Sequence, residues 1–387
     1  MMEFRKPGDK LMLHYRIATP MFLGGASQEV DDKHFRNASF RGALRFWWRA
    51  LNWARFYRDA RKNKQQALKD MHAEEKRLFG MAADNSADSR QSRVQVRSRM
   101  ENAHKTDAGS SKFDALSYFL GQGLWSHQKK LLRDCISSGD IEITLTIAPS
   151  QDAAQKRKDV ESIAQAAIAL GLFGGLGSRS RKGLGSLSLE SLQINDETPE
   201  RFDSVEAVRK FVAKLPKDTP DNETPLSAFT EGHEVQIIEK QGNAFLTNPV
   251  SALEHVSDTM QSYRSNKKSF GNDAKIMRDE LDGTKSSALP KRSVFGLPHN
   301  YFFRKRGGVG VNVQGNRRRA SPLFIHVHHV CDSDGSERYV IVQTLLPAIF
   351  LPDELKINIK PGNRDGHAIG ADHVDYGVIQ KYMREFK

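Results

Sequence analysis

Cysteine is scarce in this sequence, and long apolar runs are missing from it. The two cysteines among the 387 residues, Cys135 and Cys331, are too few for a disulfide framework or for a zinc site with four thiolate ligands. No apolar run approaches the ~20 residues that a membrane-spanning helix needs, and residues 1–7 contain no apolar signal core. We therefore expect a cytoplasmic protein.

Negative charge is also in short supply. Lys and Arg number 59 against 47 Asp and Glu, which gives a formal net charge of +12. This excess favours an anionic partner such as nucleic acid. The length and the 38% of hydrophobic residues suffice for the cores of two or three domains, so the chain is not a disordered one.

The most unusual stretch of the sequence is a loop in which two Gly-Leu-Gly units enclose a basic pentapeptide. Glycine reaches backbone angles that other residues avoid, and it lets a large ligand approach the main chain. The loop therefore predicts a binding site for a polyanion, although a flexible hairpin with solvated charges has the same pattern. The residues expected to contact RNA here are Gly175, Gly177, Arg179, Arg181, Lys182, Gly183 and Gly185.

The order of elements around this loop argues against a nucleotide cofactor. The pattern predicts a helix over residues 160–172 before the loop and a strand over residues 186–194 after it. A P-loop runs from a strand into a helix, and here Lys182 precedes its glycine. A Rossmann fingerprint also fails, because Ser180 stands where the third glycine is required. We predict no cofactor.

Residues 41–57 form the clearest helical pattern, with Ser39 as its expected N-cap. One face is apolar, and a second carries Arg41, Arg45 and Arg49. Arginines interleaved with aromatic residues suit RNA, because guanidinium groups pair with phosphates and rings stack on bases. A solvated charged face with ordinary core aromatics is the alternative. A third face, which one small domain can hardly bury, predicts a surface for a partner subunit. It consists of Phe46, Trp53 and Tyr57.

The predicted elements indicate an α+β fold with two ferredoxin-like (RRM-like) domains, antiparallel sheets and insertions. Residues 1–195 form the first domain, residues 196–231 a proline-rich linker, and residues 232–387 a degenerate second domain with a basic insertion. Strands are expected at residues 11–17, 92–99, 141–147 and 186–194, near Glu234, and over residues 323–331 and 338–345; helices are expected at 41–57, 113–138 and 160–172 and over most of 249–281. The basic segment 267–319 is expected to be mobile without a ligand.

Candidate catalytic and metal-binding residues are few. Asp31 and Asp32 precede the arginine-rich helix, where an acidic pair would hold a metal ion or assist attack by a 2′-hydroxyl group, and His14 lies in the first strand. His326 and His328 have the spacing of a metal pair on one strand face, but no third ligand can be assigned. Exposed loop acids and hydrogen-bonded histidines are far commoner than sites. We predict neither a metal site nor an enzyme.

Several motifs together resemble the RAMP superfamily of CRISPR effector proteins, and most closely the first subunit of the type III-B Cmr complex. The motifs are Thr19-Pro20-Met21-Phe22-Leu23-Gly24-Gly25, the block from Phe40 to Ala50, Leu78-Phe79-Gly80, the glycine loop, and Arg318-Arg319-Ala320-Ser321-Pro322-Leu323. The resemblance implies two ferredoxin-like domains in a ribonucleoprotein that finds RNA with a CRISPR RNA guide. It also implies a position near the 3′ end of the guide, beside a neighbouring RAMP subunit.

These observations predict a non-catalytic RNA-binding subunit whose partners are CRISPR RNA, target RNA and other Cmr subunits. Besides the residues of the loop and the helix, the phosphate contacts are expected to include Arg317, Arg318 and Arg319. One alternative is an endoribonuclease of the same superfamily that processes CRISPR RNA or cuts target RNA. Another is a purely architectural subunit, in which the aromatic face docks a neighbour and the charge is incidental.

Overall fold

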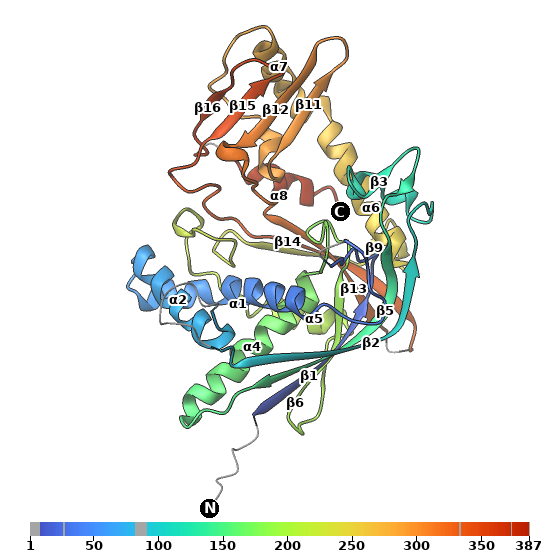
Figure 1. Ribbon diagram of the computed structural model, residues 1–387, viewed down its shortest axis with the longest axis vertical. Coiled ribbons are helices and arrows are strands. Elements are labelled where there is room, and N and C mark those ends of the chain that lie inside the picture. The colour runs from blue at the N-terminus through green and yellow to red at the C-terminus, as the bar shows by residue number, and fades with distance from the viewer. Residues whose placement is uncertain (1–7, 26–27, 82–90, 333, 373, 387) are drawn as a thin grey trace, which may run out of the picture. The chain divides into compact units, whose positions relative to one another are not determined.

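The chain forms two compact units in a computed structural model that describes residues 8–25, 28–81, 91–332, 334–372 and 374–386 (Figure 1). Unit 1 contains the described parts of Met1–Pro216, Ile237–His255 and Ile325–Val342. Unit 2 contains those of Lys217–Gln236, Val256–Phe324 and Gln343–Lys387. The domain boundaries at residues 195 and 231, and the ferredoxin-like interpretation of residues 232–387, stay predictions.

Unit 1 is built on an antiparallel five-stranded sheet with the order β2-β5-β1-β6-β7. The side chains of the central strand β1 alternate between the two faces of the sheet. Leu11 and Leu13 are fully buried on one face, whereas His14 on the other face is exposed. With helices α1 and α4 in the chain order β1-α1-β2-β5-α4-β6, this sheet has the ferredoxin-like arrangement that the sequence predicts. The strands are β1 (Asp9–Ile17), β2 (Val94–Thr106), β5 (Cys135–Ile147), β6 (Leu187–Ile194) and β7 (Glu200–Arg201).

Helices α1 and α4 pack on the sheet of unit 1, and α2 packs along α1 (Figure 1). The hydroxyl group of Tyr15 on β1 donates a hydrogen bond to the carbonyl oxygen of Ala167 on α4, at 2.9 Å. Helix α2 is not among the predicted elements, because the sequence between residues 60 and 90 is mostly charged and polar. The helices are α1 (Asn37–Asp59), α2 (Lys64–Phe79), α4 (Ala153–Phe173) and α5 (Val205–Val212).

The predicted helix over residues 113–138 is wrong. This insertion between β2 and β5 contains short elements, and β5 already begins at Cys135. Gly121 and Gly123 adopt φ values of +57° and +91°, which a helix interior does not allow, and they turn the chain between these elements. The elements are η1 (Asp114–Leu116), α3 (Ser117–Leu120), β3 (Trp125–Ser126) and β4 (Lys130–Leu131).

A second sheet, with the order β13-β14-β8, contains the predicted hairpin and the predicted strand near Glu234. The boundaries between the two units fall inside these strands, and residues 325–342 belong to unit 1. There, the amide groups of Val327 and His329 donate hydrogen bonds to the hydroxyl oxygens of Ser186 and Ser188, at 3.1 and 2.9 Å. The strands are β8 (Glu234–Ile238), β13 (Leu323–Cys331) and β14 (Glu337–Leu345), and a small hairpin, β9 (Lys240–Gln241) and β10 (Ala244–Phe245), follows β8.

Unit 2 contains an antiparallel sheet with the order β11-β12-β15-β16 and a core to which α7 contributes Ile276 and Met277. The basic segment 267–319 therefore contains regular elements, and the expectation of a mobile stretch is wrong for it. Alternation of Val309, Val311 and Val313 supplies the apolar face. Helix α6 (Pro249–Ser265) begins in unit 1 and ends in unit 2. The other elements of unit 2 are η2 (Asp221–Glu223), α7 (Lys267–Leu281), η3 (Lys291–Phe295), β11 (His299–Phe303), β12 (Gly307–Val313), η4 (Gln314–Asn316), β15 (Ile357–Pro361), β16 (His367–Ile369) and α8 (Gly377–Met383).

In the described part of the chain, every helix is too short or too polar to cross a bilayer.

Candidate nucleic-acid interface

The glycine loop joins α4 to β6, as predicted, and folds tightly against its own chain. Gly177, Gly183 and Gly185 have φ values of +91°, +80° and +65°. A Cβ atom on Gly177 would lie 2.6 Å from the carbonyl oxygen of Phe22, and one on Gly185 would overlap the carbonyl oxygen of Leu176. Gly183 and Gly185 are buried. These glycines are required by packing within the protein, so the expectation that RNA touches the backbone of Gly183 and Gly185 is wrong.

Hydrogen bonds to the segment after β1 hold the loop in place. The amide group of Gly185 donates to the carbonyl oxygen of Pro20 at 2.9 Å, and that of Ser178 donates to the carbonyl oxygen of Phe22 at 3.0 Å. The hydroxyl group of Thr19 donates to the carbonyl oxygen of Gly183 at 2.5 Å. The Thr-Pro-Met-Phe motif and the glycine loop are therefore two halves of one rigid structure. A flexible hairpin is not what the sequence encodes here.

The basic residues of the loop lie at its surface and contact neighbouring aromatic rings. The guanidinium carbon of Arg181 lies 5.4 Å from the ring centroid of Phe46, and the ammonium group of Lys182 lies 5.4 Å from the centroid of Phe119. Arg179 is exposed and donates a hydrogen bond to the carbonyl oxygen of Gln122 at 3.3 Å. These contacts orient the three cations at the surface of the loop.

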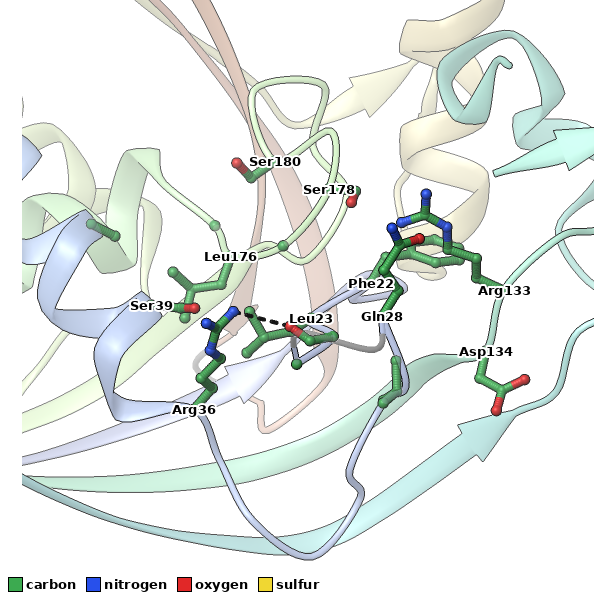
Figure 2. Close-up of a pocket in the computed structure, with 16 residues that line it drawn as sticks. Phe22, Leu23, Gln28, Arg36, Ser39, Arg133, Asp134, Leu176, Ser178 and Ser180 are labelled. Atoms are coloured by element: carbon green, nitrogen blue, oxygen red, sulfur yellow. Dashed lines mark hydrogen bonds between the residues drawn. The ribbon is translucent and has the colours of Figure 1, made fainter. Parts of the chain in front are cut away.

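A cavity of about 520 Å³ opens between this loop, the segment after β1 and the start of α1 (Figure 2). Figure 2 shows Ser178 and Ser180 of the loop on one side, Arg36 and Ser39 at the start of α1 on another, and Arg133 and Asp134 opposite them. The carboxylate of Asp134 forms an ion pair with Lys105 Nζ at 2.7 Å. The hydrogen bond from Lys105 is the main cause of the lowered pKa of Asp134. The two arginines therefore leave the cavity with a net positive charge.

The N-terminus of α1 adds to this positive potential. The helix is 23 residues long, its first turn contains no acidic residue, and no side chain caps it. Uncapped amide groups and the helix dipole favour an anion at this end. The predicted cap, Ser39, is instead inside the helix, where it lines the cavity. The guanidinium group of Arg36 donates to the carbonyl oxygen of Gly24 at 3.1 Å, which positions it at the rim.

The arginine face of α1 has a partner that the sequence did not reveal. Glu75 of α2, 3% exposed, accepts from Arg45 Nε at 2.7 Å and from Arg49 Nη1 at 3.0 Å. These two arginines hold α2 against α1, and their predicted contacts with phosphate would have to compete with this carboxylate. Arg41, one turn nearer the cavity, has no hydrogen bond or ion pair to the part of the chain that the structure describes.

The predicted aromatic partner face is wrong for two of its three residues. Trp53 is fully buried and Tyr57 is 6% exposed, because α2 and α4 both pack along α1. Phe46 is half-buried beneath Arg181. Side chains without exposed surface cannot dock a subunit, so Trp53 and Tyr57 are core residues.

The predicted basic residues of unit 2 include exposed side chains and one that packs on an aromatic ring. Arg317 and Arg318 are exposed, whereas the guanidinium carbon of Arg319 lies 5.4 Å from the ring centroid of Phe350. Phe302 on β11 is 82% exposed. Its cross-strand neighbour is Gly308, which has no side chain to cover the ring.

His326 and His328 are buried structural residues. Their ring nitrogens lie 2.6 Å from the carbonyl oxygen of Gly174 and 2.8 Å from that of Phe202. Burial lowers the pKa of His326 to about 3 and that of His328 to about 4, so both rings are neutral at physiological pH. His326 ties β13 to the start of the glycine loop, and His328 ties it to the segment after β7.

The candidate catalytic residues are not assembled into one site. Asp31 accepts hydrogen bonds from the amide groups of Lys33 and His34, which lower its pKa, and its other oxygen lies 3.0 Å from His34 Nδ1. Asp32 lies beside it in the loop before α1. His14 lies on β1, where its register partners are Glu142 and Ser191.

Sequence reasoning missed Arg36, Arg133 and Glu75. Arg36 and Arg133 are isolated cations in loops, and no periodic pattern distinguishes them from other surface arginines. Glu75 interrupts the apolar stripe of α2, which Ala67, Met71 and Leu78 otherwise form. Because Glu75 is charged, the apolar period of α2 is interrupted, and the sequence predicts neither the helix nor the ion pairs of Glu75 with α1.

Comparisons with known proteins indicate which family and which fold this chain is similar to. Residues 14–188 match the model of the RAMP superfamily. A chain of the type III-B Cmr-beta complex bound to cognate target RNA is 11% identical, with a TM-score of 0.50 over 98% of this chain and 99% of that one. Cmr1 from Pyrococcus furiosus is 18% identical, with a TM-score of 0.47 over 89% and 90% of the two chains. No match was found among curated proteins.

Proposed function

We propose that this chain, which carries a RAMP superfamily domain over residues 14–188, is an RNA-binding, non-catalytic subunit of a type III-B CRISPR ribonucleoprotein. Its partners are guide and target RNA and the neighbouring subunits of the complex. The likeness to a chain of the Cmr-beta complex supports the fold of such a subunit, and the net charge of +12 supports an RNA partner. As in the family, the chain would lie near the 3′ end of the guide.

The cavity at the start of α1 is the observation that carries this proposal. Arg36 and Arg133 offer guanidinium groups, Ser39 and Ser178 offer hydroxyl groups, and the uncapped helix end offers amide groups. These donors suit a phosphate group and do not read a base edge. Sequence discrimination then comes from pairing between guide and target. The rigid glycine loop fixes one wall, so binding needs little ordering of the protein backbone.

Two further arginines extend this site along an RNA strand. Arg179 is exposed and lies between Ser178 and Ser180 of the loop, and the partly buried Arg41 lies between Ser39 and Ala43 of α1. A single strand is the form that suits the surface, since exposed rings and guanidinium planes stack on unpaired bases. In unit 2, the exposed ring of Phe302 and, separately, the exposed Arg317 and Arg318 offer the same kinds of group to RNA.

Salt-dependent RNA binding by the purified full-length chain tests the proposal. The double variant Arg36→Ala/Arg133→Ala should lower the affinity for labelled single-stranded RNA and make the salt dependence shallower by ~1.4, at ~0.7 per lost phosphate contact. A matched control, Lys69→Ala/Arg157→Ala, removes the same charge from exposed positions on α2 and α4 that do not line the cavity. It should leave the slope close to that of the wild type.

Equal slopes for the two double variants would show that only net charge matters and would reject the cavity as the binding site. The same samples, resolved on a denaturing gel, test for cleavage. Intact RNA is the expected result, because the carboxylate of Asp31 accepts local hydrogen bonds from the amide groups of Lys33 and His34. Discrete products that disappear in Asp31→Ala would establish the endoribonuclease instead.

A further inference from the structure

Three side chains with metal-binding groups meet at the hairpin of β13 and β14. His329 and Cys331 are two residues apart on β13 and project from the same face of the strand, and Glu337 lies at the start of β14. Their ligand atoms all lie within 4.8 Å of one another. His329 is 2% exposed, whereas Glu337 is exposed, so the cluster is anchored in the protein and accessible from solvent.

The distances between these atoms approach those of a tetrahedral zinc site. His329 Nε2 lies 4.0 Å from Cys331 Sγ and 3.5 Å from Glu337 Oε1. Zinc bonds of ~2.0–2.3 Å at tetrahedral angles require about 3.3–3.6 Å between ligand atoms. Movements of up to about an ångström, within the reach of the exposed Glu337 side chain, would close the site. A water molecule would complete the fourth position on the solvent side.

The surroundings of His329 match the outer shell of a metal-bound histidine. Glu190 Oε1 on β6 lies 3.4 Å from His329 Nδ1, the ring nitrogen that faces away from the cluster. A carboxylate at this position favours a proton on Nδ1 and leaves the Nε2 lone pair for a metal ion. Glu190 is itself held by Arg16 Nε at 2.8 Å. Glu190 is thus a positioning residue for the histidine ligand.

Arg16 also contacts the third ligand. Its Nη1 atom lies 3.3 Å from both carboxylate oxygens of Glu337. In the metal-free protein this ion pair holds Glu337 near the cluster, and a bound cation would take over one carboxylate oxygen. All five residues, Arg16, Glu190, His329, Cys331 and Glu337, belong to unit 1, where β1 and β6 of the ferredoxin-like sheet meet the hairpin.

We propose that His329, Cys331 and Glu337 bind one zinc ion, with Glu190 orienting the histidine. The thiolate and imidazole ligands favour zinc over magnesium or manganese, which prefer oxygen ligands. Binding deprotonates the Cys331 thiol and releases that proton to solvent. The ion would join the two strands of the β13–β14 hairpin beside its turn, independently of RNA.

Cobalt titration of the untagged, reduced and chelator-treated full-length chain tests this site. One equivalent of Co²⁺ should produce a thiolate-to-cobalt charge-transfer band and the visible bands of a tetrahedral centre, and Zn²⁺ should displace both. The thiolate band should be lost in Cys331→Ser and kept in the control Cys135→Ala, which removes the other, buried cysteine. Glu190→Gln, which leaves all three ligands in place, should weaken zinc binding ~10–100-fold.

The proposal fails if the wild type shows no thiolate band at one equivalent, or if Cys331→Ser retains it. It fails equally if Glu190→Gln binds zinc as tightly as the wild type, because the carboxylate then only pairs with Arg16. Circular dichroism of each variant identifies loss of folding. His329→Gln provides a second ligand variant, and it should lose the tetrahedral visible bands while keeping the secondary structure of the wild type.

Discussion

Substitution of Glu75 separates the structural role of the arginine-rich face of α1 from a role in RNA binding. The buried carboxylate of Glu75 receives Arg45 at 2.7 Å and Arg49 at 3.0 Å. The side chains of the two arginines are 38% and 36% exposed, whereas that of Glu75 is 4% exposed. Removal of the carboxylate therefore leaves two cations that can turn to water. Removal of both arginines leaves a buried carboxylate without a partner.

This asymmetry sets the expected magnitudes. Glu75→Ala loses two charge-assisted hydrogen bonds, partly screened at the exposed ends, and should lower the free energy of unfolding by about 2 kcal/mol. The double variant Arg45→Ala/Arg49→Ala should cost more, about 3–5 kcal/mol, because the charge that remains is the buried one. Arg45→Ala alone should cost about 1 kcal/mol, since Arg49 still pairs with Glu75.

Urea unfolding of the three variants, followed by circular dichroism, measures these differences. RNA binding by the folded fraction of Arg45→Ala is measured at two salt concentrations. The account predicts a stability loss with an unchanged salt slope. Wild-type stability in Arg45→Ala together with a shallower slope would refute the assignment and restore Arg45 as a phosphate contact.

Three other predictions concern the loop, the buried histidines and unit 2. Gly185→Ala should destabilise the chain by more than ~2 kcal/mol in thermal or urea unfolding, because its φ of +65° and the overlapping carbonyl oxygen exclude a Cβ. The control Gly42→Ala, in an open helical position, should stabilise the chain by ~0.5–1 kcal/mol. Equal effects of the two substitutions would contradict the close packing of the loop. Burial holds the pKa of His326 at about 3 and that of His328 at about 4, below their value of 6.5 in the unfolded chain, so the unfolded state binds more protons and stability should fall by up to ~2 kcal/mol per histidine between pH 6.5 and 5. His328→Gln should reduce this pH dependence in urea unfolding, and an unchanged profile would count against it. Phe302→Ala should weaken binding of single-stranded RNA by ~1–3 kcal/mol with no change in salt slope, as expected for loss of stacking on an 82% exposed ring; unaltered affinity in a fluorescence-polarisation titration would remove this surface from the proposal.

The ferredoxin-like order of the first half could be predicted because its central elements follow simple periods. β1 alternates between buried and exposed residues, and α1 and α4 have clear helical patterns. The predicted resemblance to the RAMP superfamily is confirmed by the family match over residues 14–188. Local sequence patterns therefore suffice to predict the order of the central elements from β1 to β6.

The errors arose where tertiary contacts override local pattern. Helix α2 was missed because Glu75 lies within its buried stripe. The aromatic face of α1 was assigned to a partner because the burial of Trp53 and Tyr57 cannot be seen in the pattern of the helix alone. Residues 267–319 were expected to be mobile on composition, but Asp273 is fully buried there and accepts hydrogen bonds from the amide groups of Lys291 and Arg292, at 2.8 and 3.0 Å. A charge that is paired inside the protein looks the same in sequence as one in water.

The candidate site was predicted only in part for a related reason. The sequence identified the glycine loop and assigned its glycines to a ligand. In the structure, Gly177 and Gly185 instead leave room for the carbonyl oxygens of Phe22 and Leu176. The cavity brings together three segments that are far apart in the sequence, around Arg36, Arg133 and Ser178. No single motif contains this arrangement. For the metal hypothesis, the sequence pointed to His326 and His328, whereas the neighbouring His329 and Cys331 face the carboxylate of Glu337.

Crosslinking of bound RNA to the wild-type chain, followed by mass spectrometry of the linked peptides, tests the central claim most directly. The account predicts that nucleotides crosslink to peptides that line the cavity, around residues 22–43, 133–134 and 175–180, and that Arg36→Ala/Arg133→Ala reduces these products. Crosslinks confined to α2 and α4, with the cavity peptides unmodified, would contradict it.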